Sequence, residues 1–175
     1  LIELSLEGKV LRSIPITGAA NLEGVAVLGD GYMAISDERQ HNLSIFRINA
    51  DTRALDVKEF VQQVDLAPVG ESNKGFEGLA WDARNQRFLL GNEKNPLALY
   101  ELASDGRKIT GKLRELASLG SLMTDLSGLT VDPKVSPPLL KAPFSAKTET
   151  CENHSIRITS SALTGTTKLE GIGPG

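Results

Sequence analysis

Short runs in which apolar and polar residues alternate follow one another along most of the chain. Examples are GVAVL, YMAIS and LSIFRI, which begin at Gly24, Tyr32 and Leu43. Residues that favour turns separate them, such as the GDG at 29–31. Alternation with a period of two, bounded by such joints, is typical of β-hairpins. The pattern predicts an all-β protein built from short antiparallel strands.

A longer repeat places a glutamate and a glycine directly before strand-like runs. It reads NLEGVAVL at 21–28, GFEGLAWD at 75–82 and DLSGLTVD at 125–132, where Ser127 replaces the glutamate. The glycines of the three copies lie 54 and 50 positions apart. A period of about 50 residues is in the range of propeller blades. Glycine after the glutamate fits a strand that begins where two backbones approach closely.

The repeat divides the chain into blades of four strands each. It predicts the end of one blade at 1–16, whole blades at 21–68 and 75–120, and the first strand of another at 125–133. The fold class is therefore a β-propeller fragment, with half a blade, two whole blades and one further strand.

The expected joints between strands lie at Glu7-Gly8, at 29–31 and at Asp105-Gly106. Two runs, 54–66 and 112–122, could instead form short amphipathic helices, because periodicity alone does not settle short apolar runs. The repeat favours strands in both, since each blade needs a fourth strand there.

The pattern changes after Pro133. Residues 135–175 are rich in Ser, Thr, Pro and Lys and contain no Asp-Gly joint. This composition predicts an irregular tail. An alternative is that the tail is not the native continuation, for example because of a shifted reading frame.

Several motifs together resemble the SdiA-regulated protein family over about residues 1–133. They are NLEGVAVLGDGYMAISDERQHNLSIFRIN, then GFEGLAWDARNQRFLLGNEKNPLALYEL, then DLSGLTVDP. The resemblance implies a bacterial, calcium-associated, six-bladed propeller, distantly akin to phytase-like and esterase-like propellers. It also implies a periplasmic protein or one anchored on the outer side of the cell membrane. The family's biochemical activity is poorly defined, so the resemblance informs the fold more than the function.

Five carboxylates are predicted to gather at one mouth of the propeller channel. The first strand of each blade lines the channel, so Glu23 and Glu77 should be neighbours, with Asp125 nearby in the next blade. The second strand of an antiparallel hairpin returns to the same mouth, which adds Glu38 and Glu93. Clustered carboxylates repel one another unless positive charge compensates. Calcium, which takes six to eight oxygen ligands, is the predicted cofactor.

Two other roles for these carboxylates stay open. Arg39 follows Glu38 and Lys94 follows Glu93, so ion pairs within a blade could provide the compensation. Catalytic acid–base work is the third possibility. The corresponding functions are a calcium-binding sensor or binding module, a calcium-dependent phytase-like or esterase-like hydrolase, and a metal-free interaction scaffold.

The composition argues against two classes of partner, nucleic acids and the membrane interior. The 175 residues carry a net charge of −3, and no Lys/Arg cluster indicates nucleic-acid binding. The sequence contains no apolar run of about 18 residues, so it predicts no membrane span. Leu1 already lies in a strand pattern, so we expect a fragment whose open blade faces favour self-association. Trp81 is predicted to pack between blades and His41 to lie in a loop.

Overall fold

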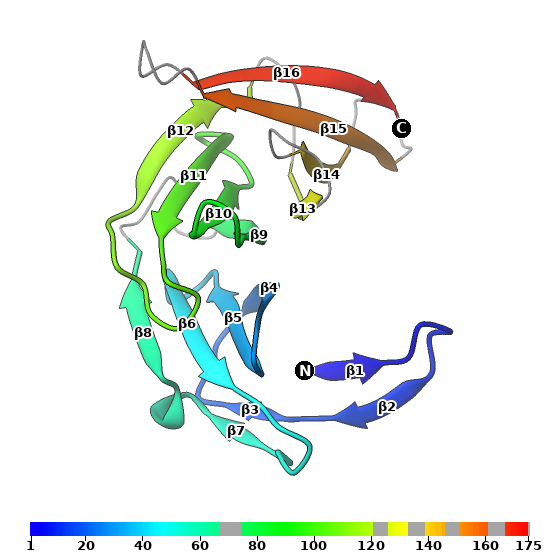
Figure 1. Cartoon of the computed structure of the whole chain (residues 1–175), viewed down its shortest axis with the longest axis vertical. Helices are drawn as coiled ribbons and strands as arrows, with labels where there is room; N and C mark the ends of the chain where they lie inside the picture. Colours follow the sequence, from blue (N-terminus) through cyan, green and yellow to red (C-terminus); the bar gives the residue numbers. More distant parts are fainter. Residues whose placement is uncertain (67–74, 121–125, 133–138, 146–150, 161–166, 175) are drawn as a thin grey trace.

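The computed structural model describes residues 1–66, 75–120 and 126–132, and the backbone of three further strands at 139–145, 151–160 and 167–174. Its sheets stand side by side around an open arc, with the first strand of each sheet toward the centre (Figure 1). The all-β prediction is confirmed. No helix among the described residues is long and apolar enough to cross a membrane.

The chain begins with a two-stranded antiparallel sheet of β1 (Ile2–Leu4) and β2 (Val10–Ser13). Their joint lies at Glu7-Gly8 as predicted, and Gly8 has a φ of 79°, which favours glycine. The chain then reaches β3 (Ile16–Thr17), which pairs in parallel with β7 (Leu55–Asp56). This parallel pair was not predicted.

Blade 1 is a four-stranded antiparallel sheet in the order β4 (Leu22–Gly29), β5 (Tyr32–Asp37), β6 (Asn42–Arg47) and β8 (Gln62–Asp65). The run 55–66 is not one strand, which corrects the prediction. It contains β7, a single 3-10 turn at Val57–Glu59 and then β8. Asp56 starts the turn because its side chain accepts a hydrogen bond from the Lys58 backbone N–H at 2.9 Å.

Blade 2 repeats this order with β9 (Phe76–Asp82), β10 (Arg87–Asn92), β11 (Ala98–Ala103) and β12 (Arg114–Ser118). Gly24 and Gly78 are each the third residue of the first strand of their blade, so the two copies of the repeat begin equivalent strands. The joint at Asp105-Gly106 is also confirmed, since Gly106 has a φ of 83°.

A third four-stranded sheet joins β13 (Thr130–Asp132) to β14 (Leu139–Ser145), β15 (Cys151–Ser160) and β16 (Thr167–Pro174). The prediction of an irregular tail over 135–175 is wrong for the described residues 139–145, 151–160 and 167–174, which form strands. Thr and Ile suit a pleated strand, and antiparallel pairing does not require an Asp-Gly joint. Composition alone therefore did not predict these strands, which the backbone pairing shows.

The core lies between the blades, because the sheets of blades 1 and 2 bury apolar side chains on both faces. One cluster joins blade 1 to blade 2, and its members include Ala34, Leu43, Ile45, Phe88 and Leu90, all fully buried. A second cluster joins blade 2 to the residues around β13, and a third joins blade 1 to Ile14. Stability therefore depends on contacts between neighbouring blades, as in repeat proteins.

The repeated glycine allows the first strands of adjacent blades to approach. A Cβ added at Gly24 would lie 2.5 Å from the Leu79 Cβ and 2.9 Å from the Ser36 Oγ. Ser36 ties the same two blades together, because its hydroxyl accepts from the Gly24 N–H at 2.9 Å and donates to the Phe76 carbonyl at 3.1 Å. A side chain at this position would separate them.

Candidate metal site

The glutamates of the repeat occupy equivalent places at the start of the first strands. Glu23 is the second residue of β4 and Glu77 the second residue of β9. Each precedes the glycine that packs closely against the next blade. The sequence therefore folds so that a carboxylate leads each first strand.

The second strands bring two more glutamates back to this end. The backbone N–H of Glu38, after β5, donates to the Asn21 carbonyl at 2.9 Å. The backbone N–H of Glu93, after β10, donates to the Gly75 carbonyl at 3.1 Å in the same way. Glu38 and Glu93 are thus equivalent residues, and each lies at the end of its blade where the first strand begins.

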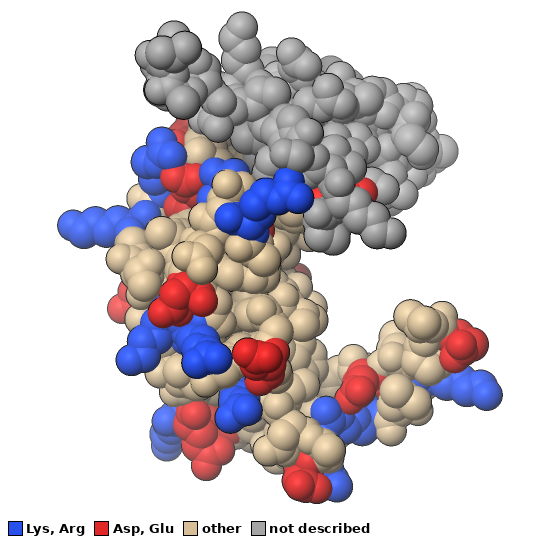
Figure 2. Space-filling view, in the orientation of Figure 1, with Lys and Arg blue, Asp and Glu red and all other residues tan. Residues whose placement is uncertain are grey.

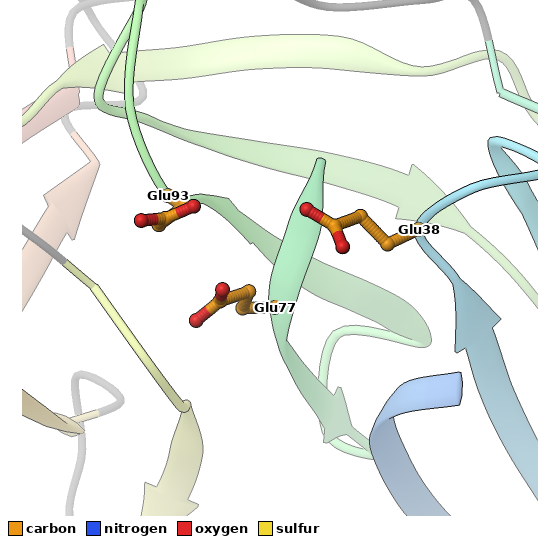
Figure 3. Close-up of side chains that lie close together, drawn as sticks. All are labelled: Glu38, Glu77 and Glu93. Carbon is orange, nitrogen blue, oxygen red and sulfur yellow. The ribbon is translucent and has the colours of Figure 1, made fainter. Parts of the chain in front are cut away.

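Three of these carboxylates meet. Glu38, Glu77 and Glu93 each offer a carboxylate oxygen, and these oxygens lie within 4.8 Å of one another. All three residues are half-buried. Figure 3 shows the side chains of Glu38 and Glu77 directed toward a common space that Glu93 borders. Because Glu38 belongs to blade 1 and the others to blade 2, the cluster spans the boundary between blades.

Hydrogen bonds from both blades hold Glu38 in this position. Its Oε2 accepts from the side-chain amide of Asn21 in blade 1 at 2.7 Å. Its Oε1 accepts from the backbone N–H of Gly75, directly before blade 2, at 3.0 Å. These two donors fix the carboxylate across the boundary and partly offset its negative charge.

Glu93 has a positive partner, as one of the open alternatives predicted. The Lys94 ammonium group forms an ion pair with the Glu93 Oε1. The carboxylates of the cluster repel one another wherever positive charge does not compensate for them. A cation would relieve this repulsion.

Comparison with known proteins identifies the family. The family model described as SdiA-regulated matches residues 1–140. The chain belongs to the SdiA-regulated family. Among solved structures, it is similar to the major allergen Mala s 1 of Malassezia sympodialis, with 11% identity and a TM-score of 0.44 over 91% of this chain and 68% of that one.

Two of the predicted ligands of this SdiA-regulated protein are not part of the cluster. Glu23 is exposed and belongs to no group of three ligand residues among the described residues. Glu23 has the same position in blade 1 that Glu77 has in blade 2. Among the described residues, however, the β1–β2 hairpin places no carboxylate beside Glu23 to form an equivalent cluster. Asp125 lies outside the described residues.

The residues before Glu38 and Glu93 are polar and buried, and their roles differ from those of the glutamates. Asp37 accepts from the backbone N–H groups of Ala20 and Gln40 at 2.7 and 2.9 Å, so it organises the loops around the cluster. Asn92 donates to the carbonyls of Lys94 and Pro96 at 2.9 and 2.7 Å. In the sequence these supporting residues can be found as the Asp and the Asn that directly precede the two glutamates.

Two further predictions for the SdiA-regulated protein are confirmed. Trp81 packs against Phe88, with the ring centroids 5.1 Å apart, beside the core that joins blades 1 and 2. His41 lies in the turn between β5 and β6 with a φ of 49°. Neither residue belongs to the carboxylate cluster.

The donor set suits a hard cation. The cluster offers carboxylate oxygens from three residues and no nitrogen or sulfur ligand. Calcium binds such oxygens with flexible geometry and completes its shell with carbonyl groups and water. Softer metals prefer imidazole or thiolate. The residues present therefore fit calcium better than zinc or copper.

Proposed function

We propose that this SdiA-regulated protein is a calcium-binding propeller that acts as a binding or sensor module outside the cytoplasm. The observation that carries the proposal is the meeting of Glu38, Glu77 and Glu93 at the boundary between two blades. Membership of the SdiA-regulated family supports the propeller-like fold on which the proposal depends.

The position of the cluster explains how calcium could act as a signal. Glu38 comes from blade 1, whereas Glu77 and Glu93 come from blade 2, so a cation held by all three links the blades. Binding to the folded state alone stabilises it by mass action, by about 1.4–2.7 kcal/mol at 10–100 times the dissociation constant. Calcium concentration would then determine how firmly adjacent blades are joined.

The expected affinity matches an extracytoplasmic role. A site of three carboxylates that each give one ligand oxygen, with Lys94 paired to Glu93, would be moderately charged. Extracellular calcium modules have dissociation constants of about 0.1–1 mM. We expect this protein to bind in that range.

Isothermal titration of calcium into the wild-type chain and a Glu77→Gln variant tests the proposal. The variant removes one ligand charge with little change in shape, and its affinity should fall about tenfold or more. Glu23→Gln is the matched control, because Glu23 takes the same place in the preceding blade but lies outside the cluster. Its affinity should equal that of the wild type.

The outcome of the titrations distinguishes a calcium site from a structural role of the carboxylates. Equal affinity in wild type and Glu77→Gln would reduce the cluster to structural ion-pair and hydrogen-bond partners. Absence of calcium binding to the wild-type chain would favour the metal-free scaffold. A loss of affinity in Glu23→Gln equal to that in Glu77→Gln would place the site elsewhere than at the boundary between blades 1 and 2.

A further inference from the structure

Lys94 forms an ion pair with a glutamate of the candidate metal site. Lys and Arg side chains lie beside Asp and Glu side chains in several places on the face shown in Figure 2. Exposed pairs such as Arg107 with Asp30, whose side chains are 64% and 78% exposed, contribute little and need no further role. The pair of Lys94 with Glu93 differs, because Glu93 is only 15% exposed and its carboxylate belongs to the cluster.

The equivalent glutamate of blade 1 is held in a different way. Glu38 accepts hydrogen bonds from one side-chain amide and one backbone N–H, which are both uncharged donors. Arg39 takes in blade 1 the place that Lys94 takes in blade 2, but it is exposed and forms no ion pair among the residues that the structure describes. Of the two blades, blade 2 therefore supplies a cationic side chain to the cluster.

We propose that Lys94 is a tethered counter-ion that calcium displaces from Glu93, an inference that rests on the calcium site proposed above. An ammonium group and a calcium ion on the oxygens of one carboxylate repel each other, because the Coulomb energy rises as the distance between like charges falls. Calcium therefore binds Glu93 fully only when the ammonium group leaves. Lys94 thereby raises the calcium concentration at which blades 1 and 2 become linked, and without calcium it holds Glu93 in place of the metal.

The surroundings of Lys94 let its side chain leave without a movement of the backbone. The buried side-chain amide of Asn92 donates to the Lys94 carbonyl at 2.9 Å and to the Pro96 carbonyl at 2.7 Å, so it fixes the loop that carries the lysine. The Lys94 side chain itself is 37% exposed, so water can solvate the ammonium group once the ion pair opens. Displacement thus needs only rotations of the lysine side chain.

A buried acceptor next to Glu93 in the chain also fits a cation at this end of blade 2. Asn92 is fully buried, and its Oδ1 has no hydrogen-bond partner among the described residues. Its counterpart in blade 1, Asp37, accepts from the backbone N–H groups of Ala20 and Gln40. Buried polar atoms are nearly always partnered. The unpaired oxygen is therefore a second feature, besides the acids, that suits a cation with its shell of water.

Calorimetric titration of calcium into the full chain and three variants tests the proposal. Lys94→Met removes the charge and keeps a side chain of similar length, so calcium should bind about tenfold more tightly. Lys94→Arg keeps the charge and should bind calcium no more tightly than the wild type. Arg39→Met is the matched control, because it removes the charge at the same place in blade 1, and its affinity should equal that of the wild type.

Two further measurements follow the lysine itself. Without calcium, Lys94→Met lacks the ion pair to Glu93 and should melt about 2–4 °C below the wild type. Saturating calcium should remove or reverse this difference. In the wild type, pulse labelling of amines with acetic anhydride, read by mass spectrometry, should modify Lys94 faster with calcium than with a chelator. The exposed lysines Lys9, Lys58 and Lys112 are internal references and should react at the same rate in both conditions.

The outcomes separate this proposal from the calcium site itself. If the wild type binds calcium and Lys94→Met binds it equally or more weakly, or if calcium leaves the labelling of Lys94 unchanged, the proposal is overturned and the site remains. Equal tightening in Arg39→Met would show a general effect of surface charge and also overturns it. Calcium binding to Lys94→Met alone supports the proposal, because the lysine then outcompetes the metal. Absence of binding to both chains overturns this proposal together with the proposed function.

Discussion

Replacing Gly24 with alanine should destabilise the protein, although alanine at an ordinary backbone conformation usually helps. The added Cβ would lie 2.5 Å from the Leu79 Cβ, 2.9 Å from the Ser36 Oγ and 3.2 Å from the Glu77 carbonyl oxygen. Overpacking of this kind costs about 1–3 kcal/mol. The entropic gain of about 0.4–1 kcal/mol from restricting the unfolded chain offsets only part of this cost.

The change should be visible in the thermal unfolding midpoint. The net loss is then about 1–2 kcal/mol. In a chain of this size 1 kcal/mol corresponds to about 2–4 °C, so the midpoint should fall by roughly 2–8 °C. Gly120→Ala is the matched control, because among the described residues its Cβ would meet only the Ser118 Oγ, at 4.0 Å. That variant should be unchanged or slightly more stable.

The atom nearest to the added methyl group is the Leu79 Cβ, which allows a second test of the same contact. Alanine at position 79 retains the Cβ that would meet the Gly24 methyl group, so Leu79→Ala should not rescue Gly24→Ala. If Gly24→Ala melted at or above the wild-type temperature, the close approach of β4 and β9 would be refuted. The explanation of the repeated glycine would fail with it.

Two further predictions concern the interior of the sheets. Burial alone would raise the pKa of Glu101, but hydrogen bonds and charges from Arg87 and Arg114 outweigh it and lower the pKa below its usual value of 4.5. The stabilising contribution of ionised Glu101 is therefore fully present above pH 4.5 and is lost as the pH falls through the lower folded-state pKa. Glu101→Gln should therefore reduce the fall of the melting temperature at acid pH. An unchanged acid dependence would contradict these ion pairs. Leu90→Ala, at a fully buried position between blades 1 and 2, should lose about 2–5 kcal/mol in urea unfolding, and a loss under about 1 kcal/mol would show that this boundary is not a packed core.

Local signals were sufficient to predict most of the fold. The joints at Gly8 and Gly106 follow from backbone conformations that glycine adopts readily, and the strands follow from alternation with a period of two. The pairing of β3 with β7 could not be predicted, because two residues in each strand leave no periodic pattern. The 3-10 turn after Asp56 was missed for a similar reason, since one side-chain hydrogen bond decides it.

The candidate site was predicted in part. Alignment of the blades correctly placed Glu38, Glu77 and Glu93 at one end of their sheets. It could not show that Glu38 extends toward blade 2 rather than toward Glu23 of its own blade. That direction is set by Asn21 and the Gly75 N–H, which are contacts between segments distant in sequence.

The direction of Glu38 also bears on how such a site can arise and disappear in evolution. Because the ligands come from two neighbouring blades, a single blade carries ligands but not a complete site. A complete site requires that both neighbours keep their acids. In the next copy of the repeat Ser127 replaces the glutamate while the glycine after it is retained, so one substitution can remove a ligand and leave the strand pattern intact. Selection on the fold and selection on the site can therefore act on adjacent residues independently.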